Sequence, residues 1–256
     1  MSIVSFDLEG DFAAFKDPSV TTNQTVTVIP SKSAVIGLIG ALLGIRRSNS
    51  IFDDIYCESY IDLLKKTAIG IKVRSQPVKW TFFTNHRSLK EAKTKPFKTE
   101  LLVAPHYTIF VKSTNEVNQV LLERLKGNNF VFSPTLGHSY CPARIPRFHK
   151  IDNVKEVEPF DRLVSAVFLD EVVESKGGNS GVKFDETDGL PARVFVERHL
   201  HHYFKGDSLK RTVLRHFIPV PVNSICSCVR LSSFYSQLSL ARFYAFDDSE
   251  EVLCLY

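Results

Sequence analysis

The sequence predicts an α+β protein: a ferredoxin-like βαββαβ domain with an inserted hairpin, followed by a β-rich C-terminal lobe. Three observations support this. Strand and helix patterns follow the order β-α-β-insert-β-α-β over residues 1–150. A basic segment with two prolines interrupts that order at about residues 76–100. Strand-like runs dominate residues 151–256. A length of 256 residues fits one large domain or two modest ones, and we expect the boundary near residue 150.

The first strand is expected at Ser2–Leu8, where apolar residues alternate with polar ones. The first helix is expected at Ser33–Leu43, because apolar residues recur there at i, i+3, i+4, i+7 and i+8. Ser31 or Ser33 can cap this helix, and Gly44 can end it.

Small residues form a stripe along this helix, namely Gly37, Gly40, Ala41 and Gly44. Glycine inside a helix costs about 1 kcal/mol relative to alanine, so its presence calls for an explanation. One explanation is that another backbone approaches closely. The other is tight packing of the helix on a sheet, and the sequence does not choose between them.

The remaining elements follow from the same periodicities. The second helix ends at a glycine, Gly127. The expected elements of the first 150 residues are a strand at Thr67–Arg74, a strand at Val103–Lys112, a helix at Asn115–Lys126, and a strand near Phe130 or after Gly137. Those expected later are strands at Leu163–Val173, Ala192–Phe204, Thr212–Val222 and Phe243–Tyr256, with a flexible loop at Gly177–Gly181.

Charge is sorted along the chain. The net charge is +4, but the window from Lys72 to Lys98 has eight Lys or Arg and one acid, Glu91, which makes it +7 and leaves −3 for the rest. The segment from Ile151 to Leu190 has ten acids and four bases, or −6. Such sorting indicates that one surface contacts a polyanion.

The basic window also carries aromatic residues. Trp80, the single Trp, and Phe82, Phe83 and Phe97 are interleaved with the cations. Cations bind phosphates and aromatic faces stack on bases, so this mixture suits single-stranded RNA. The alternative is a solvated lysine-rich loop whose aromatic residues anchor it to the core.

Two further segments are candidates for ligand contact. Ser31, Lys32 and Ser33 precede a helix, whose N-terminus favours a phosphate; the alternative is an ordinary capped helix. The segment around Gly137, with His138 and Ser139, can bring backbone close to a ligand; the alternative is a turn entering a strand.

The sequence has no motif with the ligand spacing of a known metal or cofactor site. His199, His201 and His202 cluster near Cys226 and Cys228, but the spacing is not that of a zinc site, and we expect no metal and no cofactor. The general-base candidates are His86, His106 and His138. Five irregularly spaced cysteines, no visible signal peptide and no run long enough to span a bilayer lead us to expect a cytoplasmic protein without membrane contact.

Three stretches resemble the Cas-five subunits (RAMP superfamily) of type I CRISPR Cascade complexes. These are Phe6–Gly10 through Ala13–Pro18, then Ile29–Gly44, and then Lys98–Leu102 with Pro105-His106-Tyr107 and the turn at Leu136–Ser139. Lys32-Ser33 stands where the family often has Arg-Thr, which keeps the charge but loses bidentate phosphate contact. The long β-rich tail is most similar to type I-B relatives.

The resemblance implies an RRM-type domain whose inserted hairpin is a thumb. It implies a non-catalytic subunit for antiviral defence that binds the 5′ handle of the guide RNA and caps the backbone at the foot of the complex. Its partners would be guide RNA, the backbone and large subunits, and target DNA near the PAM-proximal end. The residues expected to contact RNA are Phe15, Lys32, Ser33, Lys79, Trp80, His86, Arg87, Lys95, Lys98, Thr99, Gly137, His138 and Ser139.

Two alternative functions remain open. One is a metal-independent endoribonuclease that processes precursor guide RNA, as in type I-C relatives, for which Tyr107, His106 and nearby lysines have a suitable composition. The other is a small-ligand enzyme that uses the Gly137 loop.

Overall fold

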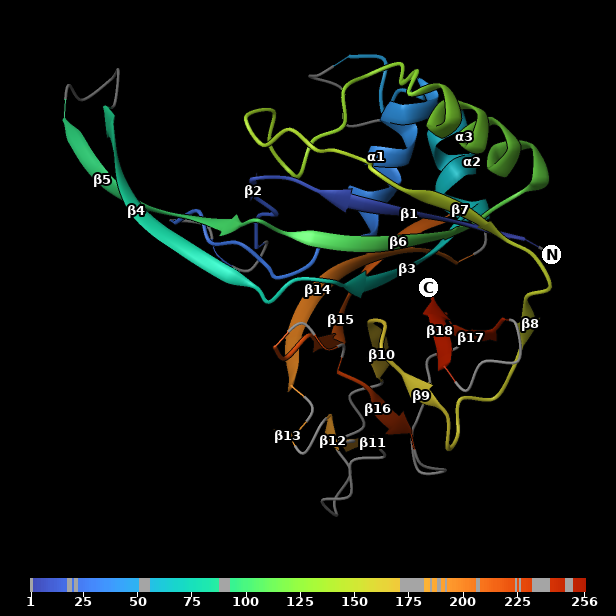
Figure 1. The fold of residues 1–256 in the computed structure, drawn as a ribbon. Coiled ribbons are helices and arrows are strands. Elements are labelled where there is room, and N and C mark those ends of the chain that lie inside the picture. The colour runs from blue at the N-terminus through green and yellow to red at the C-terminus, as the bar shows by residue number, and fades with distance from the viewer. Residues whose placement is uncertain are drawn as a thin grey trace.

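The computed structural model describes residues 2–17, 20, 23–50, 56–87, 93–170, 182–184, 186–187, 190–191, 193–205, 208–223, 225, 227–231, 240–246 and 251–256. The predicted α+β class is confirmed: these residues form three helices and several sheets (Figure 1). The loop predicted at Gly177–Gly181 lies outside the described residues.

One four-stranded sheet organises the N-terminal part. Its elements are β1 (Ile3–Glu9), α1 (Lys32–Leu43), α2 (Glu58–Lys66), β3 (Ala68–Val73), β6 (His106–Lys112), α3 (Asn115–Gly127) and β7 (Phe148–Ile151). The strand order is β3-β6-β1-β7, and every neighbouring pair is antiparallel. The three helices lie together on one side of this sheet (Figure 1). The buried residues Val4, Phe6 and Leu8 of β1 share a core with Ile36 and Ile39 of α1.

Helix α1 begins and ends as predicted. Ser31 is the N-cap and accepts a hydrogen bond from the N–H of Ala34 (3.3 Å). Gly44 is the C-cap, with the left-handed φ of 83° that glycine tolerates. Of the small residues, Gly40 is packed, since an added Cβ would lie 3.1 Å from the carbonyl oxygen of Ile45. An added Cβ at Gly37 would meet nothing within 4 Å, so this part of the stripe faces open space.

Three sequence predictions need correction. Helix α2 was not predicted, although Tyr60, Leu63 and Leu64 are buried at the i, i+3, i+4 spacing of an amphipathic helix. Helix α3 includes Gly127 as its last residue, and its C-cap is Asn128, whose φ is 46°. The strand predicted at Val103–Lys112 starts later, at His106 of β6, because Val103 ends β5 and Ala104 (φ 46°) turns the chain between the two strands.

The fourth strand was predicted near Phe130 or after Gly137, and only the second position fits. The chain after α3 bonds to α1 instead of the sheet: the N–H groups of Val131 and Phe132 donate to the carbonyls of Leu42 and Ala41 (3.3 and 3.1 Å). Strand β7 starts at Phe148, after this crossing, and pairs with β1.

The inserted segment is a hairpin, as predicted. It consists of β4 (Val78–Arg87) and β5 (Thr94–Val103), and the short strand β2 (Phe12–Ala13) pairs with β5. The hairpin projects far beyond the sheet, as Figure 1 shows at the left. Strand β5 is buried at the base of the hairpin and exposed toward the tip, whereas β4 is exposed or half-buried along its length. The base of β5 therefore joins the core, and β4 and the tip are available for contact.

The C-terminal part is built of strands, as predicted, but several are shorter. The strands are β8 (Lys155–Glu156), β9 (Leu163–Val164), β10 (Phe168–Asp170), β11 (Val182–Phe184), β12 (Glu186–Thr187), β13 (Leu190–Pro191), β14 (Arg193–Lys205), β15 (Ser208–Val220), β16 (Val229–Leu231), β17 (Arg242–Ala245) and β18 (Glu251–Leu255). Their sheets have the orders β10-β15-β14, β11-β16-β9-β18-β17-β8 and β12-β13.

The two parts of the chain share one core. Ile69 on β3 exchanges two backbone hydrogen bonds with Tyr256 (3.0 Å each), and the N–H of Val167 donates to the carbonyl of Ile71 (2.7 Å). At Gly70 an added Cβ would lie 2.6 Å from the side chain of Leu255, so only glycine fits this close approach. The boundary near residue 150 stays a prediction.

Candidate nucleic-acid interface

One face of the β4–β5 hairpin is aromatic. Trp80 lies between Phe82 (ring centroids 5.0 Å apart) and Phe12 of β2 (5.9 Å), and 51% of Trp80 is exposed. Further along the same face, His86 and Phe97 meet edge to face at 4.8 Å. Exposed rings on a projecting hairpin give a surface on which bases can stack.

The other face carries cations and Phe83, which is 73% exposed. Lys98 pairs with Glu100 at 2.8 Å. Burial alone would raise the pKa of Glu100, but hydrogen bonds from Lys98 and the N–H of Val26 keep it below its usual value. Arg87 is exposed beyond this pair, so the strongest cationic character lies toward the tip.

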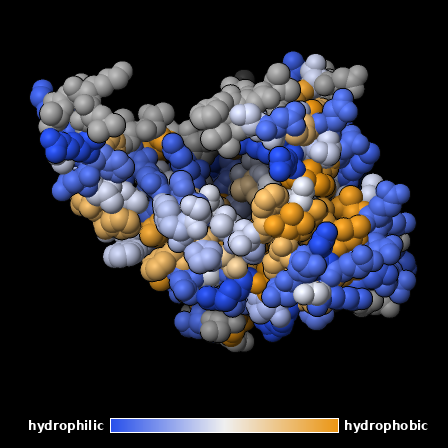
Figure 2. All heavy atoms as spheres, turned by 90° about the horizontal axis from the view of Figure 1, so that it is seen from above, coloured by the Kyte–Doolittle hydropathy of each residue, from blue (hydrophilic) through white to orange (hydrophobic). Residues whose placement is uncertain are grey.

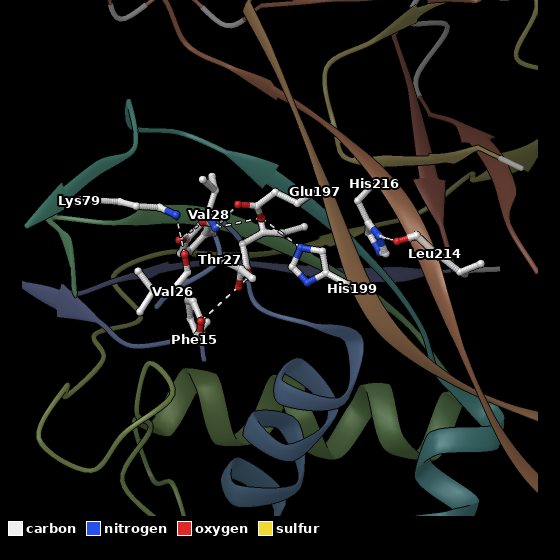
Figure 3. A network of polar contacts seen from close by, with 11 residues as sticks. Phe15, Val26, Thr27, Val28, Lys79, Glu197, His199, Leu214 and His216 are labelled. Atoms are coloured by element: carbon white, nitrogen blue, oxygen red, sulfur yellow. Dashed lines mark hydrogen bonds and ion pairs between the residues drawn. The ribbon is translucent and has the colours of Figure 1, made fainter. Parts of the chain in front are cut away.

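The segment that precedes α1 is held by side chains from distant strands. Lys79 Nζ on β4 donates to the carbonyl oxygen of Val26 at 2.6 Å (Figure 3). Both carboxylate oxygens of Glu197 on β14 accept from the N–H of Val28 at 2.9 Å, and one also lies 3.1 Å from His199 Nε2. Lys79 therefore has a structural role in addition to its predicted contact with RNA.

A cavity of about 360 Å³ lies beside the N-terminus of α1. It brings together four of the predicted residues, Phe15, Ser33, Gly137 and His138, which are far apart in sequence. The other lining residues are Ala14, Lys16, Thr27, Ser31, Ala34, His199 and Leu200. Polar groups and one aromatic ring around a space of this size suit a single nucleotide.

Gly137 shapes this cavity. Its φ is 94°, and an added Cβ would lie 2.3 Å from the carbonyl oxygen of Ala14. The adjoining His138 ring stacks on Tyr140 (5.0 Å between centroids, 8° between planes), and Tyr140 accepts a hydrogen bond from Gln24 Nε2 at 2.9 Å. Tyr140 is 57% exposed. Sequence reasoning missed it, although an aromatic residue two positions after His138 was a visible signal.

The cavity continues along the small-residue face of α1. Adjoining cavities of about 180 and 410 Å³ share Gly37 and Ala41 as lining residues. The second ends at Arg46 and Arg47. Figure 2 shows a hollow in this face of the molecule with hydrophobic residues gathered on one side of it. The stripe therefore lines a groove.

The other nine predicted residues lie outside the cavity, seven of them on β4 or β5. Lys32 is partly buried, and burial lowers its pKa to about 8. Thr99 is buried and bonds to Thr84 (3.2 Å between hydroxyls). Ser139 is exposed in the turn after His138. Their predicted contacts with RNA stay predictions.

Two of the three histidines of β14 are buried in the core. His199 and His201 share the buried face of the strand and His202 the other, as the sequence predicted. No group of three or more possible metal ligands occurs among the described residues.

Two buried histidines make stability depend on pH. Burial lowers the pKa of His201 to about 3, with the charges of Lys32 and His202 adding to the effect. Burial also lowers the pKa of His216 to about 3, with His199 contributing. The unfolded chain therefore binds protons at higher pH than the folded chain, so stability is complete above pH 6.5 and falls as the pH drops toward 3.

We expect each of these histidines to lower the unfolding free energy by about 2 kcal/mol between pH 6.5 and 5. Urea unfolding of the chain at a series of pH values measures this slope. His216→Asn, which cannot titrate, should flatten the slope whatever it does to stability at pH 7. An unchanged slope would contradict the assignment.

A polar cluster occupies the sheet at the end of β1. Asp7 accepts hydrogen bonds from Arg147 Nε (2.9 Å) and the Thr108 hydroxyl (2.7 Å), and its carboxylate lies 3.8 Å from His106 Nε2. That nitrogen is buried without a hydrogen-bond partner. Tyr107, by contrast, donates to the carbonyl of Val28 at 2.7 Å, and burial raises its pKa, which is the arrangement of a structural group.

No helix in the described part of the chain combines the length and apolar character needed to span a bilayer.

The chain was compared with protein families and with solved structures. The family described as CRISPR-associated protein (Cas_Cas5) matches residues 3–219. The chain has the fold of a CRISPR protein from Archaeoglobus fulgidus: TM-score 0.54, 15% identity, and 99% of each chain covered. A chain described as CRISPR RNA-guided surveillance complex is 15% identical, with a TM-score of 0.45 over 87% of this chain and 93% of that one.

A third structure, described as a Cas protein, is 15% identical, with a TM-score of 0.43 over 88% of this chain and 98% of that one. No curated protein sequence matches. The family match covers most of the chain, and the chain belongs to the Cas5 family of CRISPR-associated proteins.

Proposed function

We propose that this chain is a non-catalytic subunit of a CRISPR Cascade complex that binds the 5′ handle of the guide RNA. The observation that supports this most is the projecting hairpin, whose strand β4 carries the exposed rings of Trp80 and Phe83 and ends at the exposed Arg87. Membership in the Cas5 family supports the complex as its setting. The cavity beside Ser33 and Gly137 offers a second contact for the same RNA.

The element order and the strand order β3-β6-β1-β7 support a ferredoxin-like unit under the hairpin, which acts as a thumb. In this proposal the backbone and large subunits are the protein partners, target DNA lies near the PAM-proximal end, and the complex works in the cytoplasm as a type I-B-like system. The role is antiviral surveillance.

The single Trp of the chain, Trp80, provides a direct test. We expect a single-stranded oligoribonucleotide of handle length to quench the Trp80 fluorescence, because a base stacked on the indole alters its surroundings. Trp80→Ala should weaken binding by about 1–3 kcal/mol, the value of one stacked base, whereas Trp80→Phe should retain most of it. If RNA binds and the Trp80 fluorescence does not change, RNA does not contact the hairpin at Trp80.

A second candidate function, metal-independent cleavage of precursor guide RNA, is favoured by the pair of Asp7 and His106. An imidazole beside a carboxylate, with Arg147 on the same carboxylate, can act as a general base on a ribose 2′-hydroxyl. If the chain is this enzyme, it will cleave repeat RNA in EDTA, and His106→Ala will reduce the rate by about 100-fold or more. Intact RNA after incubation with the wild-type chain would exclude this function.

A further inference from the structure

A groove runs along α1 from the cavity at its N-terminus to the loop that follows the helix. Three adjoining cavities of about 360, 180 and 410 Å³ form it. The first two share Phe15, Ala34 and Gly137, and the last two share Gly37 and Ala41. Helix α1 has 12 residues and is about 18 Å long, so the two larger cavities lie toward its opposite ends. Only the first of them takes part in the proposed handle site.

The groove has positive charge at both ends and no negative charge along it. Among the described residues, no Asp or Glu lines any of the three cavities, whereas Lys16 lines the first and Arg46 and Arg47 line the last. All three cations are exposed, and none has an acidic partner in the described part of the chain. This distribution favours a ligand with repeated negative charges.

The far cavity, at the C-terminal end of α1, has the groups that hold a nucleotide. Its volume of about 410 Å³ is similar to that of the cavity beside Ser33. Phe132 lines it and is 48% exposed, so its ring is available to stack on a base. The guanidinium of Arg47 lies over the ring of Tyr56, 5.0 Å from the centroid, which holds this cation at the cavity.

A buried hydroxyl at the far cavity lacks a partner. Tyr60 lines this cavity and is only 4% exposed, yet its hydroxyl makes no hydrogen bond within the described part of the chain. Burial raises the pKa of Tyr60, so the hydroxyl keeps its proton and can donate to a ligand. Since a buried polar group without a partner is unfavourable, this hydroxyl indicates that a ligand completes the site.

Gly37 keeps the middle of the groove open. It is exposed, and an added Cβ would meet nothing within 4 Å. Glycine is unfavourable inside a helix, and no close packing explains it at this position. A larger side chain would stand in the groove, so glycine leaves room for a chain that passes from one cavity to the other.

A segment of a partner protein is the other kind of ligand that a groove can hold. The buried centre of a protein interface is depleted in charged residues, whereas nucleic-acid interfaces are more polar and more positively charged. Arg46, Arg47 and the Tyr60 hydroxyl therefore favour RNA over a protein segment.

We propose that the guide RNA runs along α1, with one nucleotide in the cavity beside Ser33 and another, farther along the strand, in the far cavity. There a base stacks on Phe132, Arg46 and Arg47 bind phosphate, and Tyr60 donates a hydrogen bond. This inference rests on the proposed function and adds to it a second nucleotide site and the path between the two.

An indole placed in the far cavity tests this path. In a full chain with Trp80→Phe and Phe132→Trp, the single indole lies in the groove and an aromatic ring is kept there. We expect a handle-length oligoribonucleotide to quench its fluorescence, because a base stacked on the indole alters its surroundings.

Removing the two arginines should weaken RNA binding. Arg46→Ala with Arg47→Ala should lower the affinity at least about tenfold. It should make the slope of log affinity against log salt shallower by about 1.4, at roughly 0.7 per lost phosphate contact. Filter binding measures both quantities. The matched control is Lys126→Ala with Lys155→Ala, which changes the net charge equally at exposed lysines outside the groove.

Blocking the groove at Gly37 should have a similar effect without loss of stability. Gly37→Leu in the indole-bearing chain should abolish the quenching and lower the affinity at least about tenfold, because the leucine side chain fills the middle of the groove. Leucine favours a helix, so the melting temperature should not fall. Gly127→Leu, the same change at the exposed last residue of α3, is the matched control.

RNA that quenches Trp80 in the wild-type chain but leaves the introduced indole unchanged would overturn this inference alone. A Gly37→Leu chain that keeps its RNA affinity would also overturn it. If that chain in addition no longer enters an assembled complex, a protein segment occupies the groove instead. A wild-type chain that binds no RNA by filter binding would overturn the handle-binding proposal as well.

Discussion

Replacing Lys79, Arg87, Lys95 and Lys98 with alanine will abolish retention of guide RNA, with affinity for a handle-length oligoribonucleotide at least about 100-fold lower. The reason is electrostatic, since each cation that neutralises a phosphate releases a counterion. The slope of log affinity against log salt should therefore become shallower by up to about 3, at roughly 0.7 per lost phosphate contact. Filter binding at several salt concentrations measures both quantities.

The structure indicates how this loss divides among the four residues. Lys79 and Lys98 already have intramolecular partners, Val26 and Glu100. Arg87→Ala should therefore change the salt slope more than Lys79→Ala, which should also loosen the segment before α1. A further variant combines Arg87→Ala with Lys95→Ala.

The matched control removes two exposed lysines elsewhere, Lys126 and Lys155, and so changes the net charge equally. RNA binding that falls as much in this control as in the Arg87/Lys95 variant would show a non-specific charge effect. Binding that survives the fourfold change would remove the hairpin from the RNA site.

Gly137→Ala will destabilise the chain by about 3 kcal/mol or more and disrupt the cavity beside α1. The new Cβ would stand 2.3 Å from the Ala14 carbonyl oxygen, at a φ of 94° that L-residues rarely adopt. A loss of this size lowers the melting temperature by roughly 6–12 °C in a chain of this length. Thermal unfolding measures the shift.

Gly37→Ala is the control for this substitution, since it makes the same chemical change inside α1. Its added Cβ meets nothing within 4 Å, so helix propensity should raise stability by about 1 kcal/mol. A Gly137 variant as stable as the wild type would mean that this turn has room to relax, and the close approach at Ala14 would then not shape the cavity.

Local chemistry was enough to predict several elements. Ser31 and Gly44 bound α1 because a side-chain oxygen and a left-handed glycine are local devices for ending a helix. Alternation predicted β1, and the basic segment interrupted by Pro77 and Pro96 predicted the inserted hairpin. The stretches around Phe6, Ile29 and Gly137 resembled the family that the match over residues 3–219 then established.

Only the tertiary structure decided which of these residues meet. Phe15, Ser33 and His138 line one cavity because the segment after β2, the start of α1 and the turn at Gly137 converge, a long-range arrangement that periodicity cannot encode. Periodicity likewise gave no sign that Lys79 bonds to Val26 or that Tyr140 stacks on His138. The sequence alone determined local conformations and the sorting of charge, because these depend on neighbouring residues; the site depends on contacts between distant ones, which only the folded chain brings within bonding distance.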